Sequence, residues 1–585
     1  MDEDFCDMSK ETIIEDASGL MAGKSYLSLP RSLVVCVVVL VCSVFLSLVF
    51  QRIGLASNGA NALGYFATFN LFVAQDTWAG PLTAAVIMAA WYWASRGRAL
   101  DLSATKAPIL VLALGAAALS LILRFVVHQN YGLSIDEFMP TFQAEIFRGG
   151  HLMAPLSEAN FAIRENLQPF FIYSDEEHLL WTAHYRPVHA AIISIFPRGV
   201  DVAFAHAILT GITVLAIADI AKRLFPDRAG APYVAILLLI GSPQVLLTSA
   251  SGFSFTTHLA LNTVWLALFL RGTWIAHIAA AIVGFFALGI HQVHVHAIYV
   301  FPFGIAMLAG YFGNRWMCLP YVVSYAIGVP MWIMWPEVAT FIQTGDVTAL
   351  PRTLLEVEYL SNYINYSEEA GSLDRQFSVM FLAVNLMRFL LWLSPAVALL
   401  LVIAIYAGRK LGPVVVISAI GFLFTVVMSH LMLPNQMHTI GSRYYHPAFA
   451  NIVIIALAAY YSQFEWRQMR LAVTSLAVIG LVGFLPWRAY QIHEKVAPRA
   501  AVQAQLNALD ADRVVIRPGG AWFMPDFVRN DPYLTKNGPV FYYERGDEPA
   551  PEFDGTSVTI TAAELIEMGL PRGTFLEPAF ELGDR

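Results

Sequence analysis

Two adjacent carboxylates, Asp136 and Glu137, stand in the segment YGLSIDEFMPTFQAEIFRGG, shortly after an apolar run that ends near His128. A carboxylate held at a membrane surface can act as a general base, because partial burial raises its pKa toward neutrality. A solvated charged pair that caps a loop would contain the same two residues. The segments that follow favour the first interpretation.

Two arginines, each next to a tyrosine, stand at other boundaries of apolar runs. Arg186 follows Tyr185 in HLLWTAHYRPVHAAIISIF, and Arg443 precedes Tyr444 in GSRYYHPAFANIVIIAL. Arginine grips phosphate well, because its planar fork donates two hydrogen bonds at once. Snorkelling arginines and an aromatic belt at a membrane surface would give the same pattern. The two pairs are therefore candidate substrate-binding residues for a phosphorylated ligand.

Histidines form a third group, with His258 in SGFSFTTHLALN and a cluster in GIHQVHVHAIYVFP. On a helix, His291 and His294 share a face, whereas His296 points away from them. The three would converge on one metal ion only if the backbone breaks there. Metal binding stays open, as does contact with a phosphate or sugar, because polar residues at membrane depth are often functional.

The composition places these residues in a membrane protein. The 585 residues are 57% hydrophobic and only 13% charged, with a mean hydropathy of +0.59. A soluble protein would carry about 25% charged residues. The net charge of −8 argues against a nucleic-acid partner, which needs a basic surface. The four cysteines show no disulfide framework.

Long apolar runs predict an all-α polytopic membrane protein, since a helix needs about 20 apolar residues to cross a bilayer. About thirteen candidate spans lie at 32–54, 79–95, 107–128, 202–222, 231–249, 254–271, 274–290, 295–311, 318–336, 378–405, 413–432, 445–462 and 471–488. The stretch 57–76 contains three asparagines, and we expect an interfacial helix there.

The loop charges predict the orientation of the spans by the positive-inside rule. With the N-terminal end inside, the inner loops carry Arg96, Arg98, Lys106, Lys222, Arg223, Arg228, Arg271, Arg315, Arg409, Lys410, Arg467 and Arg470. The outer loops carry Asp136, Glu137, Asp175, Glu176, Glu177, Glu356, Glu358, Glu368, Glu369 and Asp374. An odd number of spans then puts the last hundred residues or so outside.

Two outer segments, about 129–201 and 337–377, are too long to be turns. The first is rich in aromatic residues, so we expect membrane-surface helices. The tail begins with a helical pattern and continues with the β-like runs RVVIRPG and PVFYYER. The predicted organisation is a cytosolic tail (1–31), a transmembrane hairpin (32–104), a large transmembrane module (105–488) and a small outer α/β domain (489–585).

Several of these motifs, in this order, resemble a known family. They are the acidic pair, the Arg186–Pro element, AKRLF (221–225), GSP (241–243) and RYYHP (443–447). Over about 107–460 they look like the GT-C glycosyltransferases of the aminoarabinose transferase and protein O-mannosyltransferase kind. The resemblance implies many transmembrane helices, with outer juxtamembrane helices around a cavity. It also implies a polyprenyl-phosphate-linked sugar as donor.

The chain departs from the family pattern in four places. Two spans, 32–54 and 79–95, precede the family-like first helix. Arg186 with one proline stands where such enzymes often have lysine and two prolines. His258 lies where an acidic residue is expected, and the cluster that begins at His291 has no counterpart. The sugar, the acceptor and the use of a divalent metal ion therefore stay open.

The resemblance implies a single displacement at the anomeric carbon. Asp136, chosen over Glu137 by the resemblance, removes the acceptor's proton, and the polyprenyl phosphate leaves from the opposite face. Arg186 and Arg443 stabilise the leaving phosphate. One carboxylate and no protein nucleophile imply inversion, by analogy with inverting glycoside chemistry. The remaining side chains expected to line the cavity are Tyr185, Tyr444, His258, His291 and His294.

The alternatives are a multi-pass transporter, a non-catalytic membrane scaffold with an outer binding domain, and another enzyme of lipid-linked glycans. A transporter places its polar residues near the bilayer midplane, often in matched halves, whereas the charges here lie in unequal outer loops. The expected acceptor is a glycan, a lipid or a protein. The expected location is a bacterial inner membrane with membrane lipids around the spans and the site facing the periplasm.

Overall fold

The structure is a computed structural model. It describes residues 72–96, 107–351, 378–407, 411–433, 440–463, 467–518, 523–535, 538–545 and 555–571, and single helical positions between 34 and 49. The predictions for the tail 1–31, most of the span 32–54 and most of the interfacial stretch 57–76 lie outside these residues. The same holds for all of 97–106 in the first basic loop, for Arg409 and Lys410, and for the acidic residues between 352 and 377.

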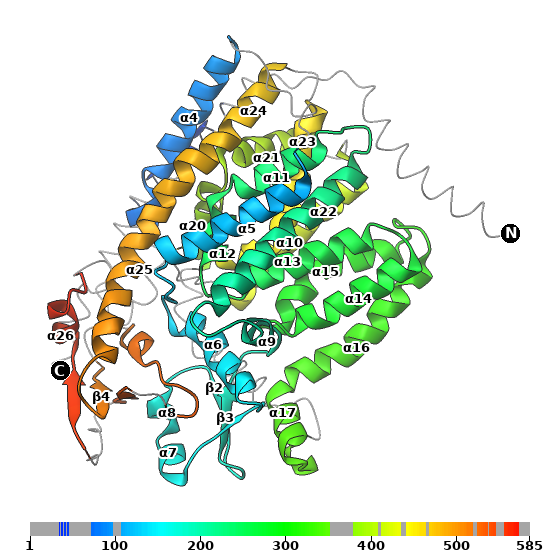
Figure 1. Ribbon diagram of the computed structural model, residues 1–585. Helices are drawn as coiled ribbons and strands as arrows, with labels where there is room; N and C mark the ends of the chain where they lie inside the picture. The colour runs from blue at the N-terminus through cyan, green and yellow to red at the C-terminus, as the bar shows by residue number, and fades with distance from the viewer. Residues whose placement is uncertain are drawn as a thin grey trace.

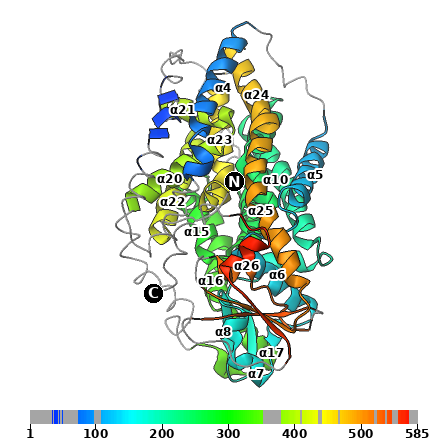
Figure 2. The ribbon, with the colours of Figure 1, turned by 90° about the vertical axis from the view of Figure 1, so that its left-hand side faces the viewer.

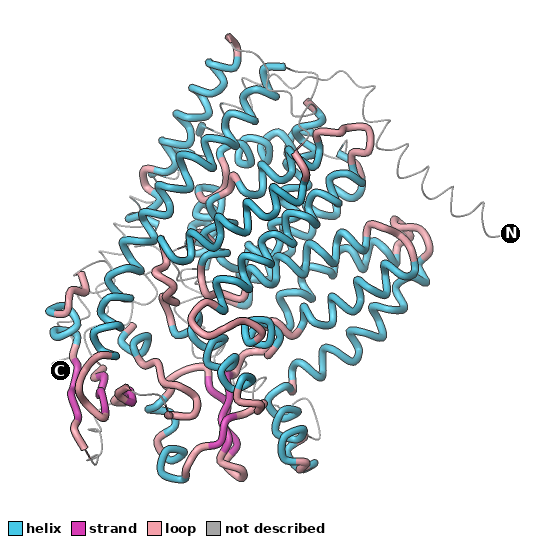
Figure 3. The backbone as a smooth tube through the Cα atoms, viewed as in Figure 1, coloured by secondary structure: helices cyan, strands magenta, loops and turns pink. Residues whose placement is uncertain are grey.

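Helices make up most of the molecule, and strands are confined to one end of it (Figure 3). The apolar helices are α4 (Ala79–Ala94), α5 (Ile109–Val126), α10 (Asp201–Leu224), α11 (Ala231–Ile240), α12 (Pro243–Ala250), α13 (Phe255–Phe269), α14 (Trp274–Leu288), α15 (Val293–Leu308), α16 (Leu319–Ile333), α20 (Ser378–Leu391), α21 (Pro395–Ala407), α22 (Pro413–Met432), α23 (Phe449–Ser462), α24 (Arg467–Ile479) and α25 (Leu485–Asn507). The helices from α4 to α24 occupy the positions of the predicted spans from 79–95 onward, whereas α25 carries several charged residues and lies mostly beyond the last predicted span.

Within the described residues, five helices are long and apolar enough to cross a membrane, or seven if each of two bent pairs makes one crossing. The outward faces of the helices are apolar; on α5, for example, Leu110, Val111 and Leu114 are exposed. Exposed apolar faces of this length are suited to lipid. The chain is therefore a multi-pass integral membrane protein, and the number of thirteen crossings stays a prediction.

The predicted single span 378–405 is wrong in its shape, because it consists of two helices. The axes of α20 and α21 differ by 119°, with the break between Leu391 and Pro395. Proline cannot donate to the preceding turn, and it disfavours helical geometry in the residue before it, here Ser394. A smaller bend of 61° separates α11 from α12, where Pro243 opens the second helix.

Short elements after α5 form the end of the molecule that lies at the bottom of Figure 1. They are α6 (Ile135–Arg148), β1 (Ala154–Pro155), α7 (Glu158–Ala162), α8 (Arg164–Leu167), β2 (Ile172–Asp175), β3 (Leu180–Ala183) and α9 (Val188–Ser194). The strands form an antiparallel sheet in the order β1-β3-β2, with Ser174 opposite Trp181. Surface helices were predicted for this segment, and the sheet was not.

The C-terminal residues meet these elements at the same end of the bundle (Figures 1 and 2). Helix α25 runs on past the predicted boundary at 488, and its last turns pack on β4 (Arg513–Ile516), η11 (Met524–Phe527), β5 (Val540–Tyr543), β6 (Ser557–Ile560) and α26 (Ala562–Glu567). The three strands are parallel, in the order β5-β4-β6. The Trp181 indole donates to the Pro532 carbonyl oxygen at 2.8 Å. This region is therefore packed on the outer loop, and its status as a separate domain stays a prediction.

Candidate functional site

The amino end of α6 carries both predicted carboxylates, and the structure gives them different surroundings. Glu137 is buried and accepts hydrogen bonds from the backbone amides of Leu133, Ser134 and Gly252, at 2.5, 3.3 and 2.8 Å. Burial raises the pKa of Glu137 above its usual value, although these amide contacts oppose the shift. Glu137 therefore caps α6 and fastens it to Gly252, a role that serves structure.

The space beside Gly252 is limited by the same contact. A Cβ atom added at Gly252 would lie 2.9 Å from the Glu137 Cβ and 3.0 Å from its carbonyl oxygen. Carbon atoms do not approach this closely without a shift of the backbone. The absence of a side chain at Gly252 thus allows α6 to lie directly against the start of α13. Phe253 and Phe255 follow Gly252 closely in the chain.

Asp136, the next-door carboxylate, is the centre of a polar contact between three segments. It accepts a hydrogen bond from the Tyr185 hydroxyl and forms an ion pair with the Arg443 guanidinium. The Arg443 Nη1 lies 2.6 Å from the Asp136 Oδ2. The Asp136 and Arg443 side chains are 13% and 11% exposed, so solvent screens the pair only weakly. Three residues predicted from separate motifs are thus in direct contact.

Arg443 is the first residue of the short 3-10 helix η9 (Arg443–Ala448) and lies among aromatic rings. Its guanidinium carbon is 5.4, 5.8 and 5.0 Å from the ring centres of Phe253, Phe255 and Tyr444. Such rings hold a cation by its attraction to their negative faces. The Arg443 Nε is buried and has no hydrogen-bond partner among the residues that the structure describes.

The backbone before Arg443 is fixed from behind. Arg388 donates to the Gly441 carbonyl oxygen at 3.3 Å, and the Gln244 amide donates to that of Ser442 at 3.4 Å. Gly441 has a φ of +43°, in the left-handed region that favours glycine. The loop that delivers Arg443 is therefore held by α12 and α20, the two helices beside the proline breaks.

Tyr185 connects the acidic centre with the predicted histidines. Its ring lies 4.2 Å from that of His291 and 5.1 Å from that of Phe171. Burial, followed by the charge of Asp136, raises the pKa of Tyr185 well above its usual value. Tyr185 is therefore a neutral hydroxyl that donates to Asp136.

Arg186, the residue after Tyr185, is nearly fully buried (2% exposed), and its guanidinium donates to two carbonyl oxygens. These belong to His184, at 2.9 Å, and to Ile333 at the end of α16, at 3.1 Å. Burial and the neighbouring charges of Arg186 and His291 lower the pKa of His184 to about 4. Arg186 thus ties the strand β3 to α16 and places positive charge next to Tyr185.

The histidines separate into two groups. His291 contacts Tyr185 at the site, and His258 is fully buried on α13 with no hydrogen-bond partner for either ring nitrogen within the described part of the chain. His296 instead bonds to Asn262 at 2.7 Å and to Tyr325 at 3.1 Å, which fixes α15 to its neighbours. His294 is half-buried near the start of α15.

No group of three or more histidine, cysteine or acidic side chains among the described residues is placed to hold a metal ion. The three histidines of this cluster do not share one helix, because His291 precedes α15 whereas His294 and His296 lie within it. The site geometry in the described residues thus rests on Asp136, Arg443 and Tyr185, with no metal-ligand set beside them.

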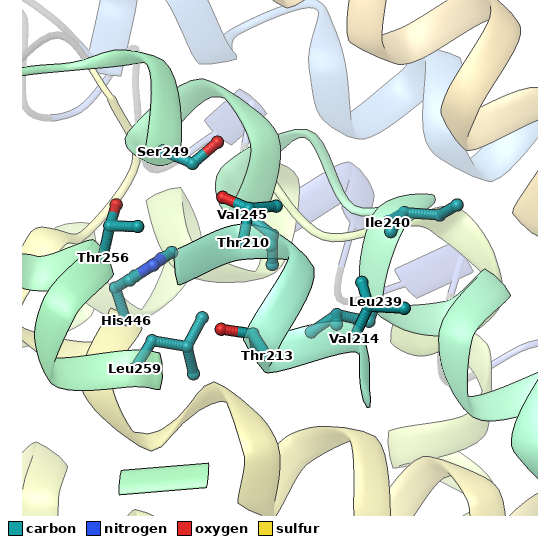
Figure 4. Close-up of a pocket in the computed structure, with 10 residues that line it drawn as sticks. All are labelled: Thr210, Thr213, Val214, Leu239, Ile240, Val245, Ser249, Thr256, Leu259 and His446. Atoms are coloured by element: carbon teal, nitrogen blue, oxygen red, sulfur yellow. The ribbon is translucent and has the colours of Figure 1, made fainter. Parts of the chain in front are cut away.

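A small cavity lies on the inner side of η9, between α10, α12 and α13 (Figure 4). Its polar lining consists of Thr210, Thr213, Ser249, Thr256 and His446. Neither ring nitrogen of His446 has a hydrogen-bond partner in the described residues. The space accommodates about one water molecule and no sugar. This cavity is therefore too small for a sugar, and none of its lining residues is among the predicted site residues.

An apolar groove begins beside Arg186 and faces outward from the bundle. Pro187, Val188 and Ile192 of the α9 region line one wall, and Phe286 and Trp332 line the other. Phe286 also lines a second apolar groove between α14 and α16. The two grooves share Ile282 and Phe286, and hydrocarbon side chains line nearly all of both.

Sequence reasoning missed three parts of the site. Phe253 and Phe255 stand in SGFSFTTH, a segment in which the family resemblance predicts an acidic residue and gives aromatic residues no role. Gly252 gave no separate signal. Asp526, whose carboxylate accepts the Ile135 amide at 2.8 Å, stands in a short MPDF segment with no motif that points to α6.

No protein-family model matches this sequence, and no curated protein matches it. Among solved structures, the chain is similar to the oligosaccharyltransferase of Archaeoglobus fulgidus, at 14% identity over 69% of this chain and with a TM-score of 0.37. It is also similar to AglB from the same organism in complex with an inhibitory peptide and a dolichol-phosphate, at 12% identity over 76% of this chain and a TM-score of 0.38.

A third similar structure is ArnT from Cupriavidus metallidurans bound to undecaprenyl phosphate, at 14% identity over 74% of this chain and 86% of that one, with a TM-score of 0.38. ArnT is an aminoarabinose transferase, the kind of enzyme that the sequence motifs resemble. The chain spans only 56% and 61% of the chains in the two archaeal structures. Likeness at this level leaves the function to be argued from the site itself.

Proposed function

We propose that this chain is an integral membrane glycosyltransferase that moves a sugar from a polyprenyl-phosphate-linked donor to an acceptor on the non-cytoplasmic face. The observation that carries the proposal is the contact of Asp136 with both Arg443 and Tyr185. A carboxylate, a guanidinium and a neutral hydroxyl meet there at the end of an apolar bundle. These are the groups that transfer from a lipid phosphate requires.

Asp136 acts as the general base in this mechanism. The acceptor hydroxyl forms a bond to the anomeric carbon while the bond from that carbon to the phosphate oxygen breaks. The acceptor's proton passes to Asp136, and the electron pair of the broken bond stays on the phosphate. Because no protein nucleophile is used, the sugar inverts at the anomeric carbon.

Arg443 binds and stabilises the phosphate. Its ion pair with Asp136 makes the carboxylate a poor base in the resting state, because a nearby cation favours the ionised form. A donor phosphate competes for the same guanidinium, and its arrival weakens the pair. Donor binding therefore raises the basicity of Asp136 at the moment when an acceptor can be deprotonated. The ring faces of Phe253 and Phe255 keep the guanidinium oriented during the exchange.

The donor's hydrocarbon chain would lie in the apolar groove that starts at Pro187 and passes between α9 and α14. Its entrance is one residue from Arg186, so a phosphate at the polar site and a chain in the groove can belong to one molecule. Burial of apolar carbon contributes about 25 cal/mol per Å², which makes a long groove an effective anchor for a polyprenyl chain.

The loop charges support a site on the non-cytoplasmic side, because Asp136 follows an apolar helix whose other end leads to a basic loop. In a bacterium this would be the periplasmic face of the inner membrane. The acceptor is then a glycan, lipid or protein of the cell envelope.

The test compares cells that lack the protein with cells that carry the wild-type chain or Asp136→Asn, by mass spectrometry of envelope glycans and glycolipids. A sugar present only with the wild type supports the proposal. Purified protein in lipid nanodiscs is then supplied with a panel of polyprenyl-phosphate sugars, and release of polyprenyl phosphate is measured. Wild-type activity in Asp136→Asn would point to a scaffold. Donor translocation without sugar transfer would point to a transporter.

A further inference from the structure

The structure assigns a positioning role to the C-terminal segment 523–533: Asp526 and Arg529 hold the amino end of α6 and thereby orient Asp136. This inference rests on the proposed function for its kinetic consequence, and on contacts alone for its structural one. By this inference, the C-terminal region helps to hold the residues of the proposed active site in place.

Two contacts fasten the segment to the backbone just before Asp136. The Ile135 amide donates to the Asp526 carboxylate at 2.8 Å, and the Arg529 guanidinium donates to the Gly132 carbonyl oxygen at 2.5 Å. The guanidinium carbon of Arg529 also lies 3.9 Å from the ring centre of Tyr131. The turn before α6 is therefore held both by a backbone amide, which donates to Asp526, and by a carbonyl oxygen, which accepts from Arg529.

The contact at Ile135 completes the capping of the helix. The first amides of a helix have no partner within it, and they attract negative charge. The amides of Leu133 and Ser134 point to Glu137, whereas that of Ile135 points to Asp526. Two carboxylates from distant parts of the chain thus divide the cap between them. Loss of the second would free the residue directly before Asp136.

The segment that carries Asp526 is itself fixed, so it can act as a rigid support. Phe527 and Val528 belong to the buried core of the C-terminal region. The Asn530 amide donates to the carbonyl oxygens of Leu167 and Phe541, at 2.6 and 2.7 Å, which joins the outer loop to β5.

A second contact reaches α6 from its other side. The Trp181 indole donates to Pro532 and packs edge-on against Phe142 of α6, with ring centres 5.2 Å apart. The C-terminal region therefore grips α6 at its first turn and, through Trp181, at its middle. Because α6 is held at two points, its orientation is fixed. The position of the Asp136 carboxylate is fixed with it.

The experiment uses the full chain in nanodiscs and compares Asp526→Ala with Glu567→Ala. Glu567 is an exposed acid on α26 of the same C-terminal region, so its removal is a matched control. Amide hydrogen exchange is followed in the peptide that covers 131–138. We expect exchange to become about 10-fold faster in Asp526→Ala and to stay unchanged in Glu567→Ala, because a freed amide exchanges through local opening.

Kinetics with a polyprenyl-phosphate sugar give the second readout. A loss of positioning should lower kcat about 10- to 100-fold with less than about a 2-fold change in the KM for the donor, because reacting groups tolerate little misplacement. Asp526→Asn keeps an acceptor oxygen for the Ile135 amide and should recover part of kcat. A merely structural role would not be rescued in this way.

Unchanged exchange at 131–138 in Asp526→Ala would overturn the inference, whatever the activity shows. Faster exchange with a wild-type kcat would overturn the positioning role and leave only a docking contact. A wild-type protein that transfers no sugar would refute the proposed function, and the exchange measurement would still decide the contact between the C-terminal segment and α6.

Discussion

Asp136 and Arg443 are separated by 307 positions in the chain, and their side chains form an ion pair with 2.6 Å between oxygen and nitrogen. The pair joins the amino end of α6 to the start of η9. Each partner is held by its own support: α6 by Glu137 and Asp526, and the loop before η9 by Arg388 and Gln244. In the proposed mechanism Asp136 is the base and Arg443 binds the phosphate, so the two groups neutralise each other until the donor arrives.

The first prediction separates the two carboxylates. Asp136→Asn keeps the shape of the side chain and loses its basicity, so turnover should fall by about 100-fold or more. Donor binding should survive or improve, because Arg443 no longer has a competing charge. Glu137→Gln should affect turnover less and lower the melting temperature, since it weakens a buried cap. Turnover at the wild-type rate in Asp136→Asn, with an inactive Glu137→Gln, would show that the other carboxylate is the base.

The second prediction concerns Arg443. Arg443→Ala should weaken binding of the polyprenyl-phosphate donor roughly 10- to 100-fold, because a hydrogen bond to a charged group contributes about 1.5–3 kcal/mol. Arg443→Lys should restore only part of the affinity, since a point charge lacks the planar fork. Binding is measured by titration of the donor into protein in nanodiscs. Equal affinity in both variants and the wild type would remove Arg443 from the phosphate site.

The positions of the helices could be predicted from the sequence, whereas their bends could not. Apolar runs indicate helices because only a helix satisfies its backbone in a bilayer, and α4 to α24 follow those runs. Pro395 was visible in 378–405, but whether a helix kinks slightly or turns by 119° depends on what packs against it. Here the Ser394 amide donates to the Ser242 hydroxyl at 3.0 Å, a contact set by tertiary structure.

The site could be predicted in its parts and not in its assembly. Asp136, Tyr185 and Arg443 each stand near the boundary of an apolar segment. The predicted topology places these boundaries on the same side of the membrane. Their direct contact depends on how α6 is rotated about its axis. The same rotation gives Asp136 and Glu137 different hydrogen-bond partners. That rotation is set by Gly252 and Asp526, two residues whose roles exist only after folding.

The third prediction uses Tyr185→Phe, which removes one hydroxyl and keeps the ring stacked on Phe171 and edge-on to His291. The Tyr185 hydroxyl donates a hydrogen bond to Asp136, and a bond donated to a carboxylate favours its ionised form. Without it, the acid limb of the rate–pH profile should move up by about 0.5–1 pH unit. An unchanged limb would mean that Tyr185 does not tune the base.

The fourth prediction tests the orientation in the membrane. In a background free of the native cysteines, a cysteine at Glu567 should react with an impermeant maleimide in intact spheroplasts, and one at Ser95 should react only after lysis. Both positions are exposed in the structure. The charge asymmetry of the loops is the reason for this expectation. Protection at 567 with labelling at 95 would invert the topology and move the site to the cytoplasmic face.

The last prediction concerns pH and the C-terminal region. Burial raises the pKa of Asp526 to about 6, against the opposing charges of Arg529 and Arg499 and with a smaller contribution from Asp136. Burial raises the pKa of the neighbouring Tyr131 to about 12, so this group stays neutral, and Glu137 and Arg124 are further charged groups close to the cluster. Because the folded pKa of Asp526 exceeds the value of about 3.9 in an unfolded chain, the folded state binds the proton more tightly.

The stabilisation from the bound proton is therefore complete below about pH 4 and is lost as the pH rises through 6. Thermal unfolding in nanodiscs, followed at pH 5 and pH 7.5, should show a higher midpoint at pH 5. Asp526→Asn, which is neutral at both values, should reduce that difference, whereas Glu567→Gln should leave it unchanged. A pH dependence as large in Asp526→Asn as in the wild type would assign the titration to another group. An absent dependence in the wild type would mean that Arg499 and Arg529 keep Asp526 ionised throughout this range.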